Sequence, residues 1–287
     1  MRVLLTGAGG QLGRALSASV PAGITLLPFT STALDLRDVT AVRDICARER
    51  PDLLVNAAAY TQVDRAESEP EQAMAVNATG VANLVAATAP TTRLLHVSTD
   101  FVFDGSGQQP YPPEHPTAPL GVYGRSKLAG EQVLQAQAPE RSCIVRTAWL
   151  YDAEGRNFVN TMLALQASRE QLQVVADQRG TPTSADSLAR ALWRLAALPT
   201  VTGILHWTDA GETSWHGFAC EIQRQALALG LLECRIPIEP VPTSVYPTPA
   251  RRPAYSVLDK TATWATLGLQ SAPWEEELER ILRQKVR

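Results

Sequence analysis

The chain has 287 residues, a net charge of −3 and 45% hydrophobic residues. A chain of this length can bury a substantial core, and its composition is that of a globular protein rather than a disordered or fibrous one. Its longest cationic run is the pair Arg251-Arg252, and no apolar run approaches the roughly 20 residues of a membrane helix, so neither nucleic acid nor a membrane is expected as a partner.

The first half of the chain alternates apolar runs with stretches of helical periodicity. The predicted strands are residues 2–7, 24–29, 52–59, 93–103 and 142–151, and the predicted helices are residues 11–20, 38–51, 69–89 and 126–137. Continuous apolar strands linked by helices indicate a parallel sheet that is covered on both faces. The sequence therefore predicts a Rossmann-type, doubly wound α/β sheet, in which ligands bind at the carboxyl ends of the strands.

The pattern loosens after about residue 150. Residues 182–198 form a predicted amphipathic helix, and residues 203–230 read as strand, turn and helix. Six prolines from Pro237 to Pro253 predict an extended loop, because proline is excluded from helix interiors and central strands. The tyrosine and arginines of this loop, Tyr246, Arg251 and Arg252, favour a binding role. The predicted organisation is an α/β domain at 1–149, on which 180–207 also packs, and a small C-terminal lobe made of 150–179 and 208–287.

The segment TGAGGQLG places Gly7, Gly10 and Gly13 between the first strand and the first helix. Glycines at this spacing allow a tight turn, a close approach of the backbone to a phosphate and close packing of the helix on the strand. The free N–H groups of the helix start then bind a pyrophosphate. A glycine triplet alone is also common in structural turns, and the strand–loop–helix context is what favours a dinucleotide site.

The residues after the second predicted strand indicate which dinucleotide is bound. NAD sites usually carry an acid there, whereas this chain has Thr30 followed by two more hydroxyl residues. Hydroxyls do not repel a 2′-phosphate, so NADPH is favoured, with NADH as the second possibility. Arg14 is the one nearby cation in the sequence, and Asp35-Leu36 could reach the adenine edge. These hydroxyl residues could also be turn residues.

Two further motifs fall where this sheet binds ligands. The fourth strand ends in Ser98, Thr99 and Asp100, which either face a ligand or bond their own backbone. Tyr123 precedes Lys127 by four residues, so the two share one face of a helix. The spacing alone fits an ordinary surface pair as well as an acid and the cation that tunes it.

The glycine loop, the alanines after the third strand, the Ser-Thr-Asp strand end and the YxxxK motif together resemble the extended short-chain dehydrogenases/reductases. More closely, six segments resemble the dTDP-4-dehydrorhamnose reductase family: VNAAAYTQVDRAESEPEQA, STDFVFDG, VYGRSKLAGE, VRTAWLY, DQRGTPT and VPTSVYPTPARRP. This resemblance covers the whole chain. It implies that 1–149 is an NAD(P)-binding Rossmann domain and that the small C-terminal lobe binds the substrate. It implies a cytoplasmic oxidoreductase of nucleotide-sugar biosynthesis that uses NAD(P)H to reduce the 4-keto group of dTDP-4-dehydro-L-rhamnose, giving dTDP-L-rhamnose.

The resemblance also implies roles for individual residues. Tyr123 would donate a proton to the carbonyl oxygen, Lys127 would lower the Tyr123 pKa and bind the nicotinamide ribose, and Thr99 would hold the carbonyl oxygen. The predicted cofactor site comprises Gly7, Gly10, Gln11, Leu12, Gly13, Thr30, Asp35, Leu36, Ala59, Tyr60, Thr61, Tyr123 and Lys127. The predicted substrate site comprises Thr99, Asp100, Trp149 and Arg252.

Other functions of the same fold remain open at this point. A dehydratase needs a second carboxylate, but Asp100 is followed by Phe101. A reductase or 4-epimerase for another nucleotide sugar, or a non-catalytic regulatory subunit, is an alternative. Some relatives are homodimers with an interfacial magnesium ion, and Asp186 could match one of its ligands. The first-helix position holds Ala15, however, and the four histidines and four cysteines lack metal-site spacing, so no metal is expected.

Overall fold

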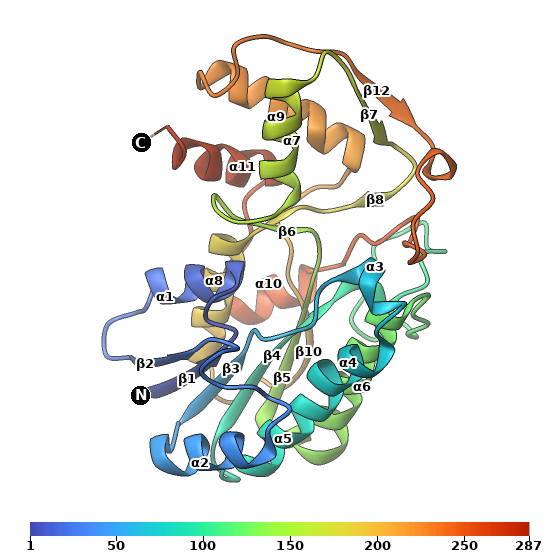
Figure 1. Cartoon of the computed structure of the whole chain (residues 1–287). Coiled ribbons are helices and arrows are strands. Elements are labelled where there is room, and N and C mark those ends of the chain that lie inside the picture. The colour runs from blue at the N-terminus through green and yellow to red at the C-terminus, as the bar shows by residue number, and fades with distance from the viewer. Residues whose placement is uncertain (287) are drawn as a thin grey trace.

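The computed structural model describes residues 1–286. Its main sheet has six parallel strands in the order β10-β5-β4-β3-β1-β2 (Figure 1). These strands are β1 (Arg2–Thr6), β2 (Thr25–Phe29), β3 (Leu53–Asn56), β4 (Arg93–Thr99), β5 (Ser142–Thr147) and β10 (Gly203–His206). The order reverses between β1 and β3, and doubly wound sheets bind ligands at such a switch point. The predicted fold class is confirmed.

Helices cover both faces of this sheet because successive side chains of each strand point to opposite faces. In β1, Val3 and Leu5 join one core, whereas Leu4 joins the other. The first core is covered by α1 (Gln11–Ala18), α8 (Ala185–Ala196) and α10 (Thr261–Leu267). The second is covered by α2 (Val39–Glu49), α5 (Gly80–Ala87) and α6 (Val122–Gln137). The strands that reach both cores therefore carry apolar residues at successive positions, such as Val3, Leu4 and Leu5.

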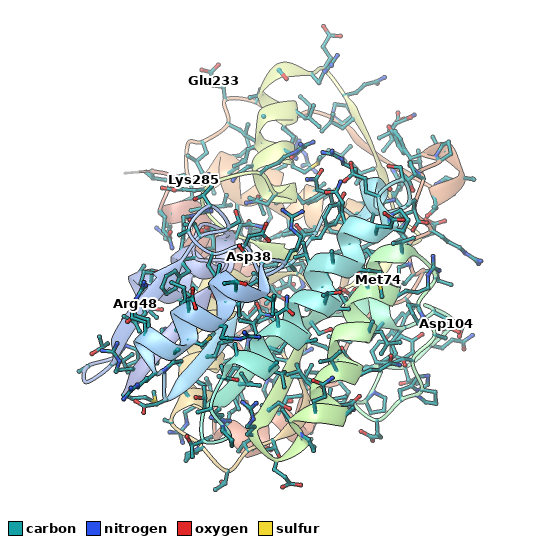
Figure 2. The ribbon with its side chains drawn as sticks, turned by 60° about the horizontal axis from the view of Figure 1, so that its bottom comes forward. Asp38, Arg48, Met74, Asp104, Glu233 and Lys285 are labelled. Carbon is teal, nitrogen blue, oxygen red and sulfur yellow. The ribbon has the colours of Figure 1, made fainter. Side chains whose placement is uncertain are left out.

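The ends of α2 follow from local chemistry. Asp38 accepts hydrogen bonds from the N–H groups of Thr40 and Ala41, both at 3.0 Å, and so caps the helix. Arg50 has a left-handed φ of 43° and precedes Pro51, which cannot continue a helix. Figure 2 labels Asp38 and Arg48 near the two ends of this helix.

The predicted helix at 69–89 is not continuous. It consists of α4 (Pro70–Met74), a π-helical turn at Ala75–Thr79 and α5. Met74, at the end of α4, is exposed and is labelled in Figure 2. Short π-helical turns often occur at functional sites, and this one carries the buried Asn77.

Three predicted strands end earlier than expected. β3 stops at Asn56, whereas the sequence predicted a strand to residue 59. β4 stops at Thr99 and is followed by a 3-10 turn at Asp100–Val102. β5 stops at Thr147, because Trp149 adopts a φ of +47°, which no strand residue can have. The remainder of the predicted strand is β6 (Leu150–Tyr151), which pairs with β9.

A third core forms a lobe at one end of the sheet (Figure 1). Its helices are α7 (Phe158–Ser168), α9 (Trp215–Ala228) and α11 (Trp274–Arg283), of which α7 and α11 were not predicted. The remaining short elements are α3 (Val63–Ala66), β7 (Leu172–Val175), β8 (Arg179–Gly180), β9 (Thr183–Ser184), β11 (Thr213–Ser214) and β12 (Ile238–Val241). No helix within residues 1–286 is long and apolar enough to cross a membrane.

Two details differ from the predicted organisation. The unpredicted helix α10 lies in the range assigned to the lobe, yet Leu267 packs in the core of the sheet domain with α8. The proline-rich segment is not wholly a loop, since β12, with Pro240 inside it, pairs with β7 in a two-stranded sheet. A strand with a single partner tolerates proline because its outer N–H groups need no acceptor within the sheet.

Candidate active site

The glycine loop lies at the switch point of the sheet. Gly7 has a φ of +73°, and a Cβ there would be 2.6 Å from the Ala57 backbone at the end of β3. A Cβ on Gly13 would overlap the Gly7 carbonyl oxygen. Gly10 precedes α1, whose first turn has no side-chain cap within the described chain. The loop therefore leaves backbone N–H groups free at a place where only glycine fits, which suits a pyrophosphate.

Leu12 and Leu36, both predicted to line the cofactor, have buried side chains, 5% and 4% exposed, so they would meet a ligand mainly through their backbone. The Gln11 side chain accepts a hydrogen bond from Asn157 at 3.0 Å. Arg14 forms an ion pair with Asp152 at 2.9 Å. Arg14 was the nearby cation considered for a 2′-phosphate, and its charge is already paired.

The end of β2 carries no unpaired acid. The hydroxyls of Thr30 and Thr32 lie 2.8 Å apart and are exposed. Asp35 forms an ion pair with Arg37 at 2.6 Å, and this hydrogen bond lowers the pKa of the Asp35 carboxyl. A phosphate near Thr30 would thus meet hydroxyls rather than an uncompensated carboxylate.

The segment after β3 is held by Asn77 of the π-helical turn. The Asn77 side chain accepts from the Tyr60 N–H at 2.8 Å and donates to the Tyr60 carbonyl at 3.1 Å. It also donates to the Ser126 hydroxyl of α6 at 2.9 Å. Ala59 and Tyr60 are half-buried, and Thr61 is exposed. Asn77 therefore ties the predicted cofactor segment to the helix that carries Tyr123.

Tyr123 and Lys127 lie on α6, next to the end of β4. The helix begins at Val122, whose N–H donates to the Glu67 carboxylate at 2.7 Å. Lys127 is buried, and its Nζ donates to the Val97 carbonyl of β4 at 2.6 Å. The Tyr123 ring packs edge-on against Phe101, with 5.6 Å between ring centroids.

Tyr123 is a buried phenol with a raised pKa. Burial raises this pKa to about 12, a hydrogen bond with Thr99 lowers it, and the Asp100 charge raises it. Tyr123 therefore holds its proton at neutral pH. The lowering of this pKa by Lys127, whose amine donates to the Val97 carbonyl, stays a prediction.

Asp100 is a buried carboxyl beside the reacting groups, 2% exposed. Its Oδ1 accepts from the Thr99 hydroxyl at 3.0 Å, whereas its Oδ2 has no hydrogen-bond partner within residues 1–286. Burial raises the pKa of Asp100 to about 6, and the nearby Ser256 and the Thr99 hydroxyl partly offset this rise. A buried acceptor without a partner has the chemistry to bind a sugar hydroxyl.

We expect Asp100→Asn to stabilise the protein above pH 6. A carboxyl whose pKa rises from 3.8 to about 6 on folding makes the folded protein less stable as the pH rises through that window. The loss is on the order of 3 kcal/mol for a shift of about two units. Chemical denaturation at pH 4 and pH 8 measures it. A variant no more stable than the wild type at pH 8 would show that the buried Asp100 carboxylate does not destabilise the fold.

Asp104→Asn is the matched control for this experiment. Asp104 is nearby in sequence, is labelled in Figure 2, and has a pKa lowered by hydrogen bonds from Ser106. The wild type should therefore lose the stability contributed by ionised Asp104 as the pH falls. Asp100 has the opposite effect, because its ionisation lowers stability as the pH rises.

Trp149 is held in a strained position. Its φ of +47° is uncommon for a large side chain. Its ring stacks on Trp215 of α9, with 3.6 Å between centroids and 10° between planes. A Cβ on Gly180 would be 2.6 Å from the same ring, so Trp149 is enclosed between two elements of the lobe. Strain that the surroundings maintain is typical of ligand-binding residues.

Arg252, predicted to bind substrate, forms a bidentate contact with Asp64 at 2.7 and 3.0 Å. The hydrogen bond to Arg252 lowers the pKa of Asp64. This pair joins the proline-rich segment to α3, which follows the predicted cofactor segment. Arg252 is thus anchored beside the site through a partner that the sequence did not indicate.

Several residues that organise the site were missed from the sequence: Asn56, Glu67, Asn77, His96 and Trp215. Each acts through a contact between segments distant in the chain, so no local motif signals it. Within the described part of the chain, no group of three His, Cys, Asp or Glu side chains could hold a metal ion. The absence of a metal remains a prediction.

The class of protein follows from what meets at the carboxyl ends of these strands. A glycine loop at the switch point accommodates a dinucleotide, while Thr99, Tyr123 and Lys127 converge at β4 and α6. This combination defines a Rossmann-fold oxidoreductase of the short-chain dehydrogenase/reductase class.

Comparison with known proteins identifies the family to which the chain belongs. The family model described as "RmlD substrate binding domain" matches residues 1–287. A dTDP-4-dehydrorhamnose reductase of Burkholderia thailandensis is 41% identical over 285 residues, covering 96% of this chain and 95% of that protein. One of Streptomyces griseus is 43% identical over 275 residues, covering 94% and 88%. The chain belongs to the RmlD substrate binding domain family.

Solved structures of dTDP-4-dehydrorhamnose reductases are similar to this chain over nearly its whole length. A dTDP-4-dehydrorhamnose reductase of Clostridium acetobutylicum superposes with a TM-score of 0.94 at 36% identity, covering all of both chains. One of Bacillus anthracis, in complex with NADP, gives 0.92 at 36% identity and covers 99% of each. A UDP-glucose 4-epimerase of Thermus thermophilus, at 0.81 and 20% identity, shares the fold.

Proposed function

We propose that this protein reduces the 4-keto group of dTDP-4-dehydro-L-rhamnose to give dTDP-L-rhamnose, using NADPH. The convergence of Thr99, Tyr123 and Lys127 beside the glycine loop is the observation that carries the proposal. The names of the relatives supply the substrate. Asp100, with its unpartnered Oδ2, and the enclosed Trp149 provide polar and apolar contacts for a sugar.

The residues present fit a bound dinucleotide. Gly7, Gly10 and Gly13 would hold the pyrophosphate, because side chains are sterically excluded there and the start of α1 is uncapped. Ala59, Tyr60 and Thr61 would line its path along the sheet. A bound NADPH supplies the hydride that reduces the keto carbon.

The chain supplies the proton. Tyr123 is protonated at neutral pH and would donate its phenolic proton to the carbonyl oxygen, which becomes the new hydroxyl group of the sugar. The Thr99 hydroxyl would help to hold that oxygen beside the phenol. The Lys127 side chain is buried. Its amine would bind the nicotinamide ribose and return a proton toward Tyr123.

The substrate is tested with a panel of 4-keto sugar nucleotides. We expect the highest kcat/KM for dTDP-4-dehydro-L-rhamnose, with one NADPH oxidised for each dTDP-L-rhamnose formed. A higher value for another 4-keto sugar nucleotide would replace the proposed substrate. Cofactor binding without turnover of any of them would favour a regulatory subunit.

We expect NADPH to serve at least as well as NADH. The end of β2 presents Thr30 and an Asp35 that is already paired with Arg37, so nothing there repels a 2′-phosphate. Thr30→Asp should raise the KM for NADPH about tenfold, since repulsion between the carboxylate and the 2′-phosphate should weaken binding by about 1.4 kcal/mol. Thr30→Asn, similar in shape and uncharged, is the control. A strong preference of the wild type for NADH would contradict this prediction.

A further inference from the structure

A chain of buried polar side chains leads from β1 to Lys127. The Thr6 hydroxyl donates to Asn56 Oδ1 at 2.6 Å, Asn56 Nδ2 lies 3.0 Å from His96 Nδ1, and His96 Nε2 lies 3.3 Å from Lys127 Nζ. Thr6, Asn56 and His96 are side by side on three adjacent strands. Each of the four side chains is at most 3% exposed. Water therefore has little access to these contacts.

The orientation of the Asn56 amide is fixed by its neighbours. Its Oδ1 accepts from the Thr6 hydroxyl and from the Ala58 N–H, the latter at 3.1 Å. A backbone N–H can only donate, so the oxygen must be on this side and the Nδ2 group must face His96. Asn56 therefore donates to His96 Nδ1, which has to be an unprotonated acceptor.

This contact determines the tautomer of His96. Burial, and next the nearby Lys127, hold the pKa of His96 well below its usual value, so the imidazole is neutral. A neutral imidazole carries one N–H. With Nδ1 accepting from Asn56, the proton is on Nε2 and points at Lys127 Nζ.

An ammonium group has donors only, whereas a neutral amine has a lone pair. Lys127 Nζ already donates to the Val97 carbonyl at 2.6 Å. The His96 Nε2–H therefore has an acceptor on Lys127 only when Lys127 is an amine. With an ammonium, the two donors would face each other inside the protein, where an unsatisfied donor costs stability.

We propose that His96, fixed as its Nε2–H tautomer by Asn56, is a positioning residue that holds Lys127 Nζ against the Val97 carbonyl and disfavours its ammonium form. This inference rests on the proposed function, since it concerns the lysine assigned to proton return. Lys127 would then release its proton near neutral pH rather than retain a permanent charge.

The surroundings of His96 and Lys127 favour a lysine whose pKa lies below its usual value. Burial lowers the pKa of Lys127 to about 8, and the charge of Glu131, one turn further along α6, raises it. Glu131 itself is paired with Arg146 of β5 at 2.7 Å. Tyr123 lies one turn earlier on α6, and His96 Nε2 of β4 lies 3.3 Å from Nζ.

The tautomer can be measured in the wild-type protein. The chain has four histidines, so ¹⁵N-labelled imidazoles can be assigned by single substitutions. We expect His96 to show a protonated Nε2 and an unprotonated Nδ1 across the neutral range. A protonated Nδ1 would overturn the proposal, whether or not any variant folds.

The effect on Lys127 is measured by titrating its ¹³Cε resonance, which is feasible because the chain has three lysines, Lys127, Lys260 and Lys285. In His96→Gln the amide can turn its oxygen toward Nζ. We expect the Lys127 pKa to rise by about one unit, the size of one hydrogen bond between buried groups. The alkaline limb of the kcat/KM profile should move up by the same amount.

His216→Gln is the matched control. His216 lies on α9 in the lobe, and its Nε2 lies 3.0 Å from the Ile238 carbonyl oxygen. This variant should leave the Lys127 titration unmoved. An unchanged Lys127 pKa in His96→Gln would overturn the proposal. If the proposed substrate were wrong, turnover would fail while the Lys127 titration still moved, so the two failures are distinguishable.

Discussion

Tyr123→Phe is expected to lose most of the turnover and to keep the fold and cofactor binding. The phenol is the proposed proton donor, and a positioned acid contributes typically about 10²–10⁴-fold to such a reaction. The Tyr123 ring packs edge-on against Phe101, and phenylalanine can make the same contact. Steady-state NADPH oxidation measures turnover, and titration of cofactor fluorescence measures binding.

Tyr151→Phe is the control for this change. Tyr151 is 1% exposed, and its hydroxyl has no hydrogen-bond partner within residues 1–286. Removing it should leave turnover unchanged and should not reduce stability. Near-normal turnover of Tyr123→Phe would remove the tyrosine from the proposed mechanism.

Arg146→Met is expected to lower the free energy of unfolding by about 3–5 kcal/mol, because it leaves a buried charge without its partner. Arg146 and Glu131 have side chains that are 2% and 0% exposed, and they lie 2.7 Å apart. Arg146 also donates to the Pro113 carbonyl at 3.1 Å and lies over the Phe103 ring. It thus joins β5, α6 and the loop before α6. Chemical denaturation measures the loss.

The double variant Arg146→Met with Glu131→Leu separates charge from packing. Replacing both members of a buried ion pair with apolar residues is often neutral or stabilising, so most of the lost stability should return. A double variant as unstable as Arg146→Met alone would show that packing, rather than an unpaired Glu131, causes the loss.

The sheet could be predicted because its signals are local. Apolar runs such as 2–7 and the cap at Asp38 need no knowledge of the rest of the chain. The glycine loop was recognisable for the same reason. A Cβ at Gly7 or at Gly13 would clash with neighbouring backbone atoms. The resemblance of the motifs to a known family supplied the reaction.

The remaining features depend on contacts across the fold. The strand at 142–151 was predicted too long because its end is set by the φ of Trp149, which the lobe maintains. The helices α7, α10 and α11 were missed. The expected influence of Lys127 on the pKa of Tyr123 stays a prediction for a related reason. The YxxxK spacing places both residues on one face but says nothing of the Val97 carbonyl that binds the amine.

The most direct test of the proposed function is to incubate the purified protein with NADPH and dTDP-4-dehydro-L-rhamnose and to identify the product by NMR. We expect dTDP-L-rhamnose in a one-to-one ratio with the NADPH consumed, and almost none with Tyr123→Phe. Recovery of unchanged substrate from the wild-type protein, with NADPH bound but not oxidised, would contradict the proposed reduction.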